Sequence, residues 1–225
     1  MVNFDKRFGD FSVLANIGAA TTNSKYNFLE GKSGYFSVAH LLALSNGNNQ
    51  RVDEDFSKKR VNSVLGNATV GYKNMLYLDV TGRNDWSSTL PSDNWSYFYP
   101  SVSLSAILSE MFTLPEQISF FKLRGSFAQV GNDTRPYRLR STYSLGLTNS
   151  SILNATASMT NPLRTLKPED TRSYEVGVDY RMFGGRLGLD LTYYNANTTN
   201  QILSITTPIS TGYTDRYINA GKMKS

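Results

Sequence analysis

Charged and aromatic residues recur at every second position in several short segments of this chain. Between positions 76 and 83, for example, Tyr77, Asp79 and Arg83 alternate with apolar residues. Side chains alternate between two faces along a β-strand, so these polar groups are expected to share one face. Charges of both signs on one face can pair across neighbouring strands and can bind polar solutes. The full set of polar candidates is Tyr77, Asp79, Arg83, Lys122, Arg124, Glu175, Asp179, Arg181, Arg186 and Asp190.

Residue types that catalysis or metal binding needs are scarce. The chain has no Cys, and its single His, His40, would have to serve any Ser-His-Asp site. Asp79 and Asp179 could pair for acid–base chemistry, but ion pairs with basic neighbours explain them more simply. Residues 53–55 are Asp-Glu-Asp, which suits Ca²⁺ but lacks the Gly and terminal Glu of an EF-hand loop, and they read as a solvated acidic turn. We therefore expect no enzyme, no metal and no cofactor.

Aromatic residues in the predicted loops are the candidates for ligand contacts. Trp86 and Trp95 fall in a predicted loop at 84–96, where aromatic faces could stack on sugar rings. The alternative, which we favour, is a loop that folds on its own aromatic residues. Other candidates fall in a predicted loop at 131–171, and they are Tyr137, Tyr143, Asn149 and Asn154.

Composition narrows the class of protein. Of 225 residues, 40% are hydrophobic and 18% charged, and Tyr and Phe number 14 and 12, a mixture that favours strands. The net charge is +5, but basic and acidic residues are interspersed, so we expect no nucleic-acid partner. The N-terminus lacks the apolar segment of a signal peptide, and no stretch reaches the ~18–20 apolar residues of a membrane helix.

The positions of the strands and loops indicate a membrane barrel. Short turns alternate with long connections at 19–60, 84–96, 131–171 and 198–213, so the long loops gather at one end. Outer-membrane β-barrels have this arrangement, with strands of about 9–11 residues. The eight predicted strands are 8–18, 61–72, 75–83, 97–108, 120–130, 172–182, 186–197 and 214–224.

Aromatic residues at strand ends support lipid as the partner of the apolar face. In outer-membrane barrels such residues form girdles at the two membrane interfaces. The polar face would then line a lumen, because Arg or Lys facing lipid costs roughly 2–4 kcal/mol at the membrane midplane. The candidate girdle residues are Tyr97, Phe98, Tyr99, Phe120, Phe121, Tyr193 and Tyr194.

Longer motifs resemble the SusC/RagA family of TonB-linked outer-membrane transporters. The segments that carry the resemblance are 74–91, 97–108, 120–133, 166–179 and 219–225. The first of them reads NMLYLDVTGRNDWSSTLP, and the third reads FFKLRGSFAQVGND. The segments keep their order and cover most of the chain.

The resemblance implies an all-β, antiparallel up-and-down transmembrane barrel of about 22 strands, of which this chain would supply about eight. It also implies an N-terminal plug domain and a TonB-contacting segment. Neither is present in this sequence, so we expect residues 1–225 to be a partial barrel domain. The implied function is TonB-powered import of oligosaccharides or peptides across the bacterial outer membrane, with a SusD-like surface lipoprotein on the long-loop side.

Two alternatives belong to other functional classes. The eight strands could close on themselves as a small barrel that serves as a binding or adhesion module. A surface hydrolase would require His40.

Overall fold

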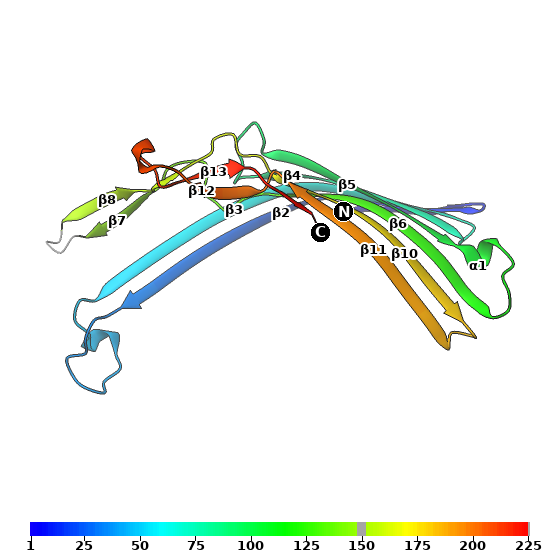
Figure 1. The fold of residues 1–225 in the computed structure, drawn as a ribbon, viewed down its shortest axis with the longest axis horizontal. Helices are drawn as coiled ribbons and strands as arrows, with labels where there is room; N and C mark the ends of the chain where they lie inside the picture. Colours follow the sequence, from blue (N-terminus) through cyan, green and yellow to red (C-terminus); the bar gives the residue numbers. More distant parts are fainter. Residues whose placement is uncertain (148–151, 225) are drawn as a thin grey trace.

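The computed structural model describes residues 1–147 and 152–224 and consists mainly of antiparallel strands (Figure 1). Nine strands form one sheet in the order β1-β2-β3-β4-β5-β6-β10-β11-β14. Their bounds are Val2–Phe8, Phe11–Lys32, Arg51–Tyr72, Leu76–Ser87, Ser96–Ile107, Ile118–Asn132, Glu169–Met182, Leu187–Thr199 and Lys222–Lys224. The sheet confirms the predicted all-β, up-and-down antiparallel fold.

Smaller elements occupy the connections. β7 (Tyr143–Leu147) pairs with β8 (Leu153–Ala157), and β13 (Asp215–Asn219) lies between β12 (Ile202–Thr206) and β9 (Thr160–Asn161). The helical segments are short: α1 (Leu108–Met111) and two 3₁₀ turns, Leu44–Asn46 and Ile209–Thr211. No helix in the described part of the chain is long and apolar enough to cross a membrane.

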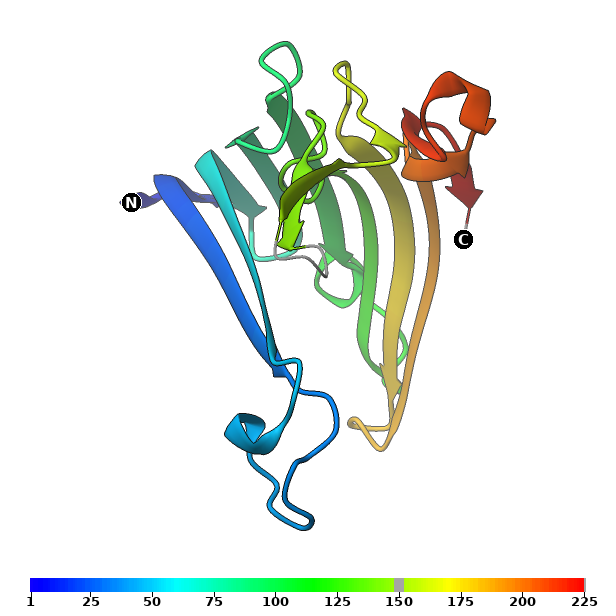
Figure 2. The same cartoon turned by 90° about the vertical axis from the view of Figure 1, so that its left-hand side faces the viewer.

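The large sheet is an open arc (Figure 2). Its strand order ends at β1 and β14, and these two strands do not pair with each other in the described structure. The alternative of a small barrel that closes on itself is therefore wrong for this sheet. Both edges are free to pair with further strands of a larger barrel.

The three short turns and the longest connections lie at opposite ends of the arc, as predicted (Figure 1), although the β5–β6 connection at the short-turn end, 108–117, is longer than the β4–β5 connection, 88–95, at the other end. Lys73 and Asn74 form the turn between β3 and β4, with φ of 50° and 58°, the conformation that two-residue hairpins favour. Lys73 Nζ lies 3.4 Å from Asp10 in the adjacent β1–β2 turn, and this carboxylate raises the pKa of Lys73. The β2–β3 connection and the β7–β8 hairpin lie at the other end.

The strand pairing separates an apolar face from a polar face. One row across β3, β4, β5, β6 and β10 contains only apolar or aromatic residues, and the neighbouring row contains only polar ones. The first row is Ala68, Val80, Val102, Phe127 and Tyr174. The second row is Thr69, Asp79, Ser103, Ser126 and Glu175. The predicted two-residue alternation is thus carried across these five strands, and it breaks at β2 and β11, where Leu14 continues the polar row and Asn195 continues the apolar row.

Several predicted boundaries are wrong. The strand predicted at 8–18 spans the turn between β1 and β2, because the Gly9-Asp10 hairpin signal was missed. Residues 19–60 are not one long loop, because β2 runs to Lys32 and β3 starts at Arg51. The acidic residues 53–55 therefore lie within β3, where successive side chains point to opposite faces and cannot converge on one ion. The strand predicted at 214–224 is divided between β13 and β14.

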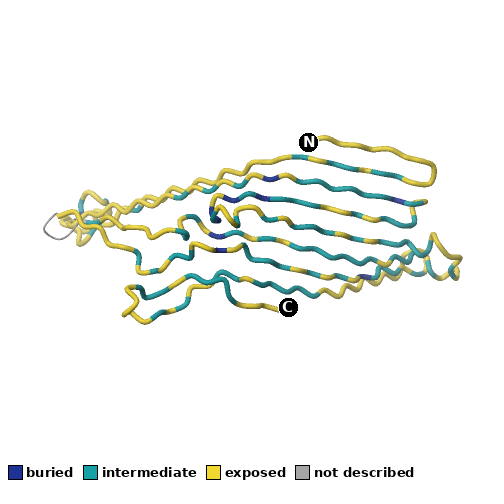
Figure 3. Tube along the Cα trace, turned by 90° about the horizontal axis from the view of Figure 1, so that it is seen from above, coloured by how far each residue is buried: buried dark blue, intermediate teal, exposed yellow. Residues whose placement is uncertain are grey.

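Few side chains are buried, because the large sheet is a single layer (Figure 3). On the apolar face Leu78 is 38% exposed and Val80 is 42% exposed. The buried apolar residues of the described chain are Leu90 and Leu166, which lie in the connections after β4 and before β10. An apolar sheet face without a protein layer on it is the arrangement expected where lipid supplies the cover.

Candidate functional site

The polar face collects nine of the ten polar candidates from the sequence. The register of the strands puts these nine on one side of the sheet: Tyr77, Asp79, Arg83, Lys122, Arg124, Glu175, Asp179, Arg181 and Asp190. The tenth, Arg186, precedes β11 and lies exposed in the β10–β11 turn, so its predicted place in a strand is wrong. In Figure 2 the connection after β6 lies between the two arms of the arc. Because Asp133 of that connection contacts Ser87 on the polar face, the polar face is the concave one.

Arg124 joins three strands at the centre of one polar cluster. Its Nη2 atom lies 2.7 Å from Asp190 Oδ1 and donates to Thr192 Oγ1 at 2.6 Å, while its Nε atom lies 4.0 Å from Glu175 Oε1. The side chain reaches these partners by lying across Gly177, where a Cβ atom would collide with it. The missing side chain at Gly177 therefore positions the guanidinium group.

A second arginine on this face is held by its own strand. Arg181 forms two hydrogen bonds to the carboxylate of Asp179, of 3.0 and 3.2 Å, and its guanidinium lies 5.1 Å from the ring centre of Phe120.

Asp79 accepts a hydrogen bond from Thr69 at 2.5 Å and another from Ser103 at 3.4 Å. Asp79 and Asp179 are thus each occupied by a different partner, and no acid–base pair forms between them.

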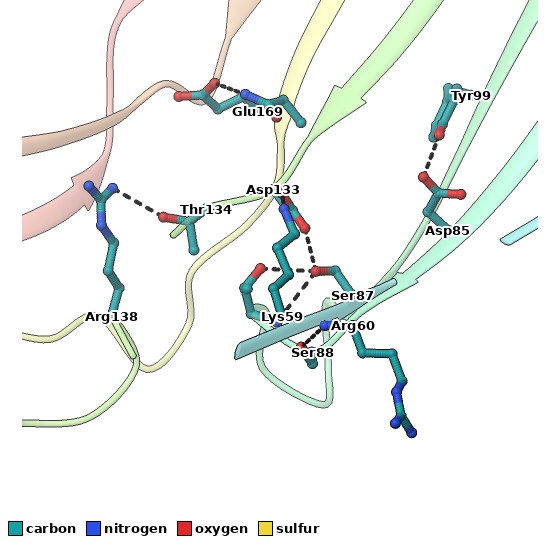
Figure 4. A network of polar contacts seen from close by, with 12 residues as sticks. Lys59, Arg60, Asp85, Ser87, Ser88, Tyr99, Asp133, Thr134, Arg138 and Glu169 are labelled. Carbon is teal, nitrogen blue, oxygen red and sulfur yellow. Dashed lines mark hydrogen bonds and ion pairs between the residues drawn. The ribbon is translucent and has the colours of Figure 1, made fainter. Parts of the chain in front are cut away.

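A third cluster lies toward the long-loop end of the polar face. Arg83 Nε lies 2.8 Å from Asp85 Oδ1, and Arg83 Nη2 donates to Ser63 at 3.1 Å. Tyr99 donates its hydroxyl hydrogen to the other oxygen of Asp85 (Figure 4). Asp85 is 5% exposed, and these partners satisfy a carboxylate that would be costly to bury alone. The sequence singled out Arg83 but not Ser63, Asp85 or Tyr99 as members of this cluster.

Asp133 fastens the long connection after β6 to the sheet. Its carboxylate accepts hydrogen bonds from Lys59 of β3 and Ser87 of β4, and Ser87 also contacts Thr89 (Figure 4). The Asp133 side chain is 6% exposed and that of Lys59 is 29% exposed. This contact, which we call the Asp133 anchor, was not predicted from the sequence.

The aromatic candidates are only partly where the sequence put them. Trp86 is not in a loop: it lies within β4 on the apolar face, whereas Trp95 is 52% exposed in the connection before β5. Among the predicted girdle residues, Tyr97 and Tyr99 turn to the polar face and Phe98 to the apolar face, because neighbours in a strand alternate. Phe121 and Tyr180 of the apolar face pack edge to face near the short turns, with ring centres 5.5 Å apart.

Two open cavities border the connection after β6, the first on its side toward β3 and the second on its side toward the β4–β5 connection. One, of about 700 Å³, is bordered by Tyr137 and Tyr143, and the other, of about 1060 Å³, is also bordered by Tyr143. Both predicted loop tyrosines thus border a cavity, although Tyr143 lies in β7. Tyr137 accepts a hydrogen bond from the backbone of Lys58 at 3.2 Å. Asn154 is exposed in β8, and Asn149 lies outside the described residues.

The arginines around these cavities were not among the sequence candidates. Arg138 and Arg140 border the first cavity, and Arg140 and Arg164 border the second. Arg138 donates to Thr134 at 3.1 Å and lies 4.7 Å from the ring centre of Tyr217. Their spacing is a signal that could have identified them as candidate site residues, since Arg135, Arg138 and Arg140 fall within six residues.

No catalytic or metal-binding constellation emerges from the described residues. His40 lies exposed in the β2–β3 connection and forms no hydrogen bond or ion pair with another described side chain. The described residues contain no group of three His, Cys, Asp or Glu side chains placed to hold a metal ion.

Known proteins are similar to this chain in sequence and in fold. The family described as "TonB dependent receptor-like, beta-barrel" matches residues 3–225. TonB-dependent receptor P26 of Formosa agariphila is 30% identical over 189 residues, which are 81% of this chain and 19% of that protein. TonB-dependent receptor P3 of the same organism is 24% identical over 72% of this chain and 17% of its own length.

Solved structures extend the likeness to the fold. The RagAB peptide transporter superposes with a TM-score of 0.85 and 20% identity, over 99% of this chain and 25% of that one. A ferric enterobactin receptor of Pseudomonas aeruginosa superposes with a TM-score of 0.62 and 19% identity, over 99% of this chain and 31% of that one. The chain thus spans between 17% and 31% of the length of these relatives.

The family match over residues 3–225, the polar concave face and the open sheet edges agree with one another. Barrels of this kind lie in the outer membrane of Gram-negative bacteria. This chain belongs to the TonB-dependent receptor-like β-barrel family, as a segment of its outer-membrane barrel.

Proposed function

We propose that residues 1–225 form part of the lumen wall and outer entrance of a TonB-dependent transporter that imports oligosaccharides or peptides. The observation that carries the proposal is the concave polar face, on which the Arg124 cluster and the Arg83–Asp85 cluster present charges of both signs. A wall of this kind offers hydrogen bonds to a polar solute without holding it in one deep site.

The other parts of the transporter would be supplied by the rest of the protein and its partners. A plug domain would close the lumen, TonB would deliver energy through it, and a SusD-like lipoprotein would cover the long-loop end. The likeness in fold to the RagAB peptide transporter supports this arrangement.

Neighbouring residues of β4 test which face meets lipid. The chain has no Cys, so Leu78→Cys and Asp79→Cys each offer a single labelling site on this segment of the full-length receptor. We expect a spin label at position 78 to be quenched by oxygen, which concentrates in lipid, and one at position 79 by a water-soluble nickel complex. The opposite pattern would show that the faces are assigned wrongly.

Transport itself needs a separate measurement. Cells that depend on this receptor for growth on an oligosaccharide or peptide should lose uptake when TonB is deleted, while receptor levels in the outer membrane stay unchanged. Uptake that continues at the same rate without TonB would contradict the proposed function.

A further inference from the structure

The connection after β6 has an unusual charge distribution. Residues 134–168 contain five basic residues and no Asp or Glu, although the whole chain has 23 basic and 18 acidic residues. The five are Arg135, Arg138, Arg140, Arg164 and Lys167. Like charges held together in one segment favour a ligand of opposite charge near that segment.

The larger cavity has two of these arginines on its border and no carboxylate to neutralise them. It has a volume of about 1060 Å³, and its border includes Arg140 and Arg164 but no Asp or Glu. The smaller cavity differs, because Glu54 and Asp55 lie on its border together with its arginines. The nearest acid along the chain from the larger cavity's border is Asp93, whose exposed carboxylate accepts a hydrogen bond from Ser92.

Arg140 and Arg164 are available to a ligand. Neither guanidinium forms an ion pair or a hydrogen bond with another residue of the described chain. Arg138 contrasts with them, because Thr134 and Tyr217 already hold it. A guanidinium group that has no protein partner can form paired hydrogen bonds with a carboxylate or a sulfate.

We propose that the larger cavity binds an anionic oligosaccharide, one that carries carboxylate or sulfate groups, through Arg140 and Arg164. This inference rests on the proposed transport function and adds the charge of the substrate. Tyr143 and Tyr213 on the same border provide aromatic faces for sugar rings, and Asn161 provides an amide for sugar hydroxyls. The volume is at the upper end of the ~300–1,000 Å³ of ordinary ligand pockets, which leaves room for more than one ring.

A saccharide fits this border better than an acidic peptide does. A peptide in extended form usually binds by adding a strand to an exposed sheet edge, where backbone groups supply the hydrogen bonds. The border of the larger cavity instead presents side-chain hydroxyl, phenol and amide groups, which match the hydroxyls of a sugar. An acidic peptide is therefore the competing occupant that the experiment has to include.

Binding to the full-length receptor in detergent tests the proposal by calorimetry with matched probes. The charged probes are oligogalacturonate and short dextran sulfate, and their neutral counterparts are methyl-esterified oligogalacturonate and dextran. Hexaglutamate represents the acidic peptide. We expect both charged saccharides to bind more tightly than their neutral counterparts and more tightly than hexaglutamate.

Three variants locate the binding site. Arg140→Gln and Arg164→Gln should each weaken binding of the charged saccharides about tenfold, the effect of losing one charge-assisted contact. Arg135→Gln removes the same charge from the same connection but borders only the smaller cavity, so it should change affinity less than about twofold. Unchanged heat-modified migration in gels verifies that each variant is folded.

Three results would overturn the inference. They are equal affinity for charged and neutral saccharides, an equal loss for Arg135→Gln, and tighter binding of hexaglutamate. Uptake of a neutral solute that still requires TonB would leave the proposed function standing while this inference fails. Conversely, a receptor that still binds the charged saccharides but takes them up without TonB would contradict the proposed function and leave this inference standing.

Discussion

Gly177 controls the position of the most connected charge on the polar face. Arg124 lies across it to reach Asp190, Thr192 and Glu175 in neighbouring strands. Any side chain at position 177 would displace the guanidinium, because a Cβ atom there would lie closer to Arg124 than real atoms approach. A glycine in a strand often marks such a close approach.

Replacement of Gly177 by Val should therefore lower the urea midpoint for unfolding of the full-length receptor. Gly188→Val is the matched control, since Gly188 lies on the same face of β11 with no atom within 4 Å of its added Cβ. Valine favours strands, so the control should unfold at the same or a higher urea concentration. Equal midpoints for the two variants would show that the contact with Arg124 has no influence on stability.

Nine of the ten polar candidates on the concave face could be predicted from the sequence, because the two-residue periodicity of a strand is a local property. The partners that complete each cluster were missed. Arg83 and Ser63 are 20 residues apart, and Lys59 and Asp133 are 74 apart. Ser63 and Arg83 belong to strands joined by the short Lys73-Asn74 turn, so the hairpin register could have paired them, whereas Lys59 and Asp133 are brought together across two longer connections whose register no local pattern specifies.

At the scale of elements, the Asp133 anchor joins a long connection to β3 and β4. Its side chain is nearly buried, so removing it leaves Lys59 and Ser87 without their shared partner. Ser87 keeps its contact with Thr89 and Lys59 is 29% exposed, so the cost falls near the lower end of the ~1–3 kcal/mol of an unsatisfied buried group, which increases the population of the detached connection about tenfold.

Asp133→Ala should accordingly speed tryptic cleavage of the folded receptor after Arg138 and Arg140 about tenfold. Mass spectrometry of the fragments measures the rate at each site. Glu116→Ala is the control, because Glu116 is exposed near the short turns and should leave the rate unchanged. An unchanged rate for Asp133→Ala would mean that other contacts hold the connection.

The lengths of the elements were harder to predict than their number and alternation. β2 and β3 each extend over 22 residues, and their outer halves are rich in Asn, Ser, Lys and Asp rather than alternating apolar residues. Residues 51–60 of β3 pair only with β2, and Lys58 and Lys59 contact the connection after β6 through polar groups, so the alternating apolar pattern disappears there. The strand is maintained there by its backbone ladder, which leaves little trace in the sequence.

At the scale of the whole molecule, the open arc leaves two strand edges and one apolar face without cover. Produced alone, the 25.1 kDa chain should aggregate in water and dissolve only in detergent. Light scattering and gel filtration with and without detergent measure this. A monodisperse monomer in plain buffer would contradict the account of the apolar face as a lipid-covered surface.

The length of the β2–β3 hairpin affects which part of the chain is exposed at the cell surface. Each of its strands is about 70 Å long at ~3.3 Å per residue, whereas the lipid-facing band of a barrel is only about 25 Å tall. Its tip, residues 33–50, therefore stands well above the membrane and makes little contact with the rest of the sheet. Antibodies and phages that reach the long-loop end would meet this tip, and its sequence can vary to escape them at little cost to folding.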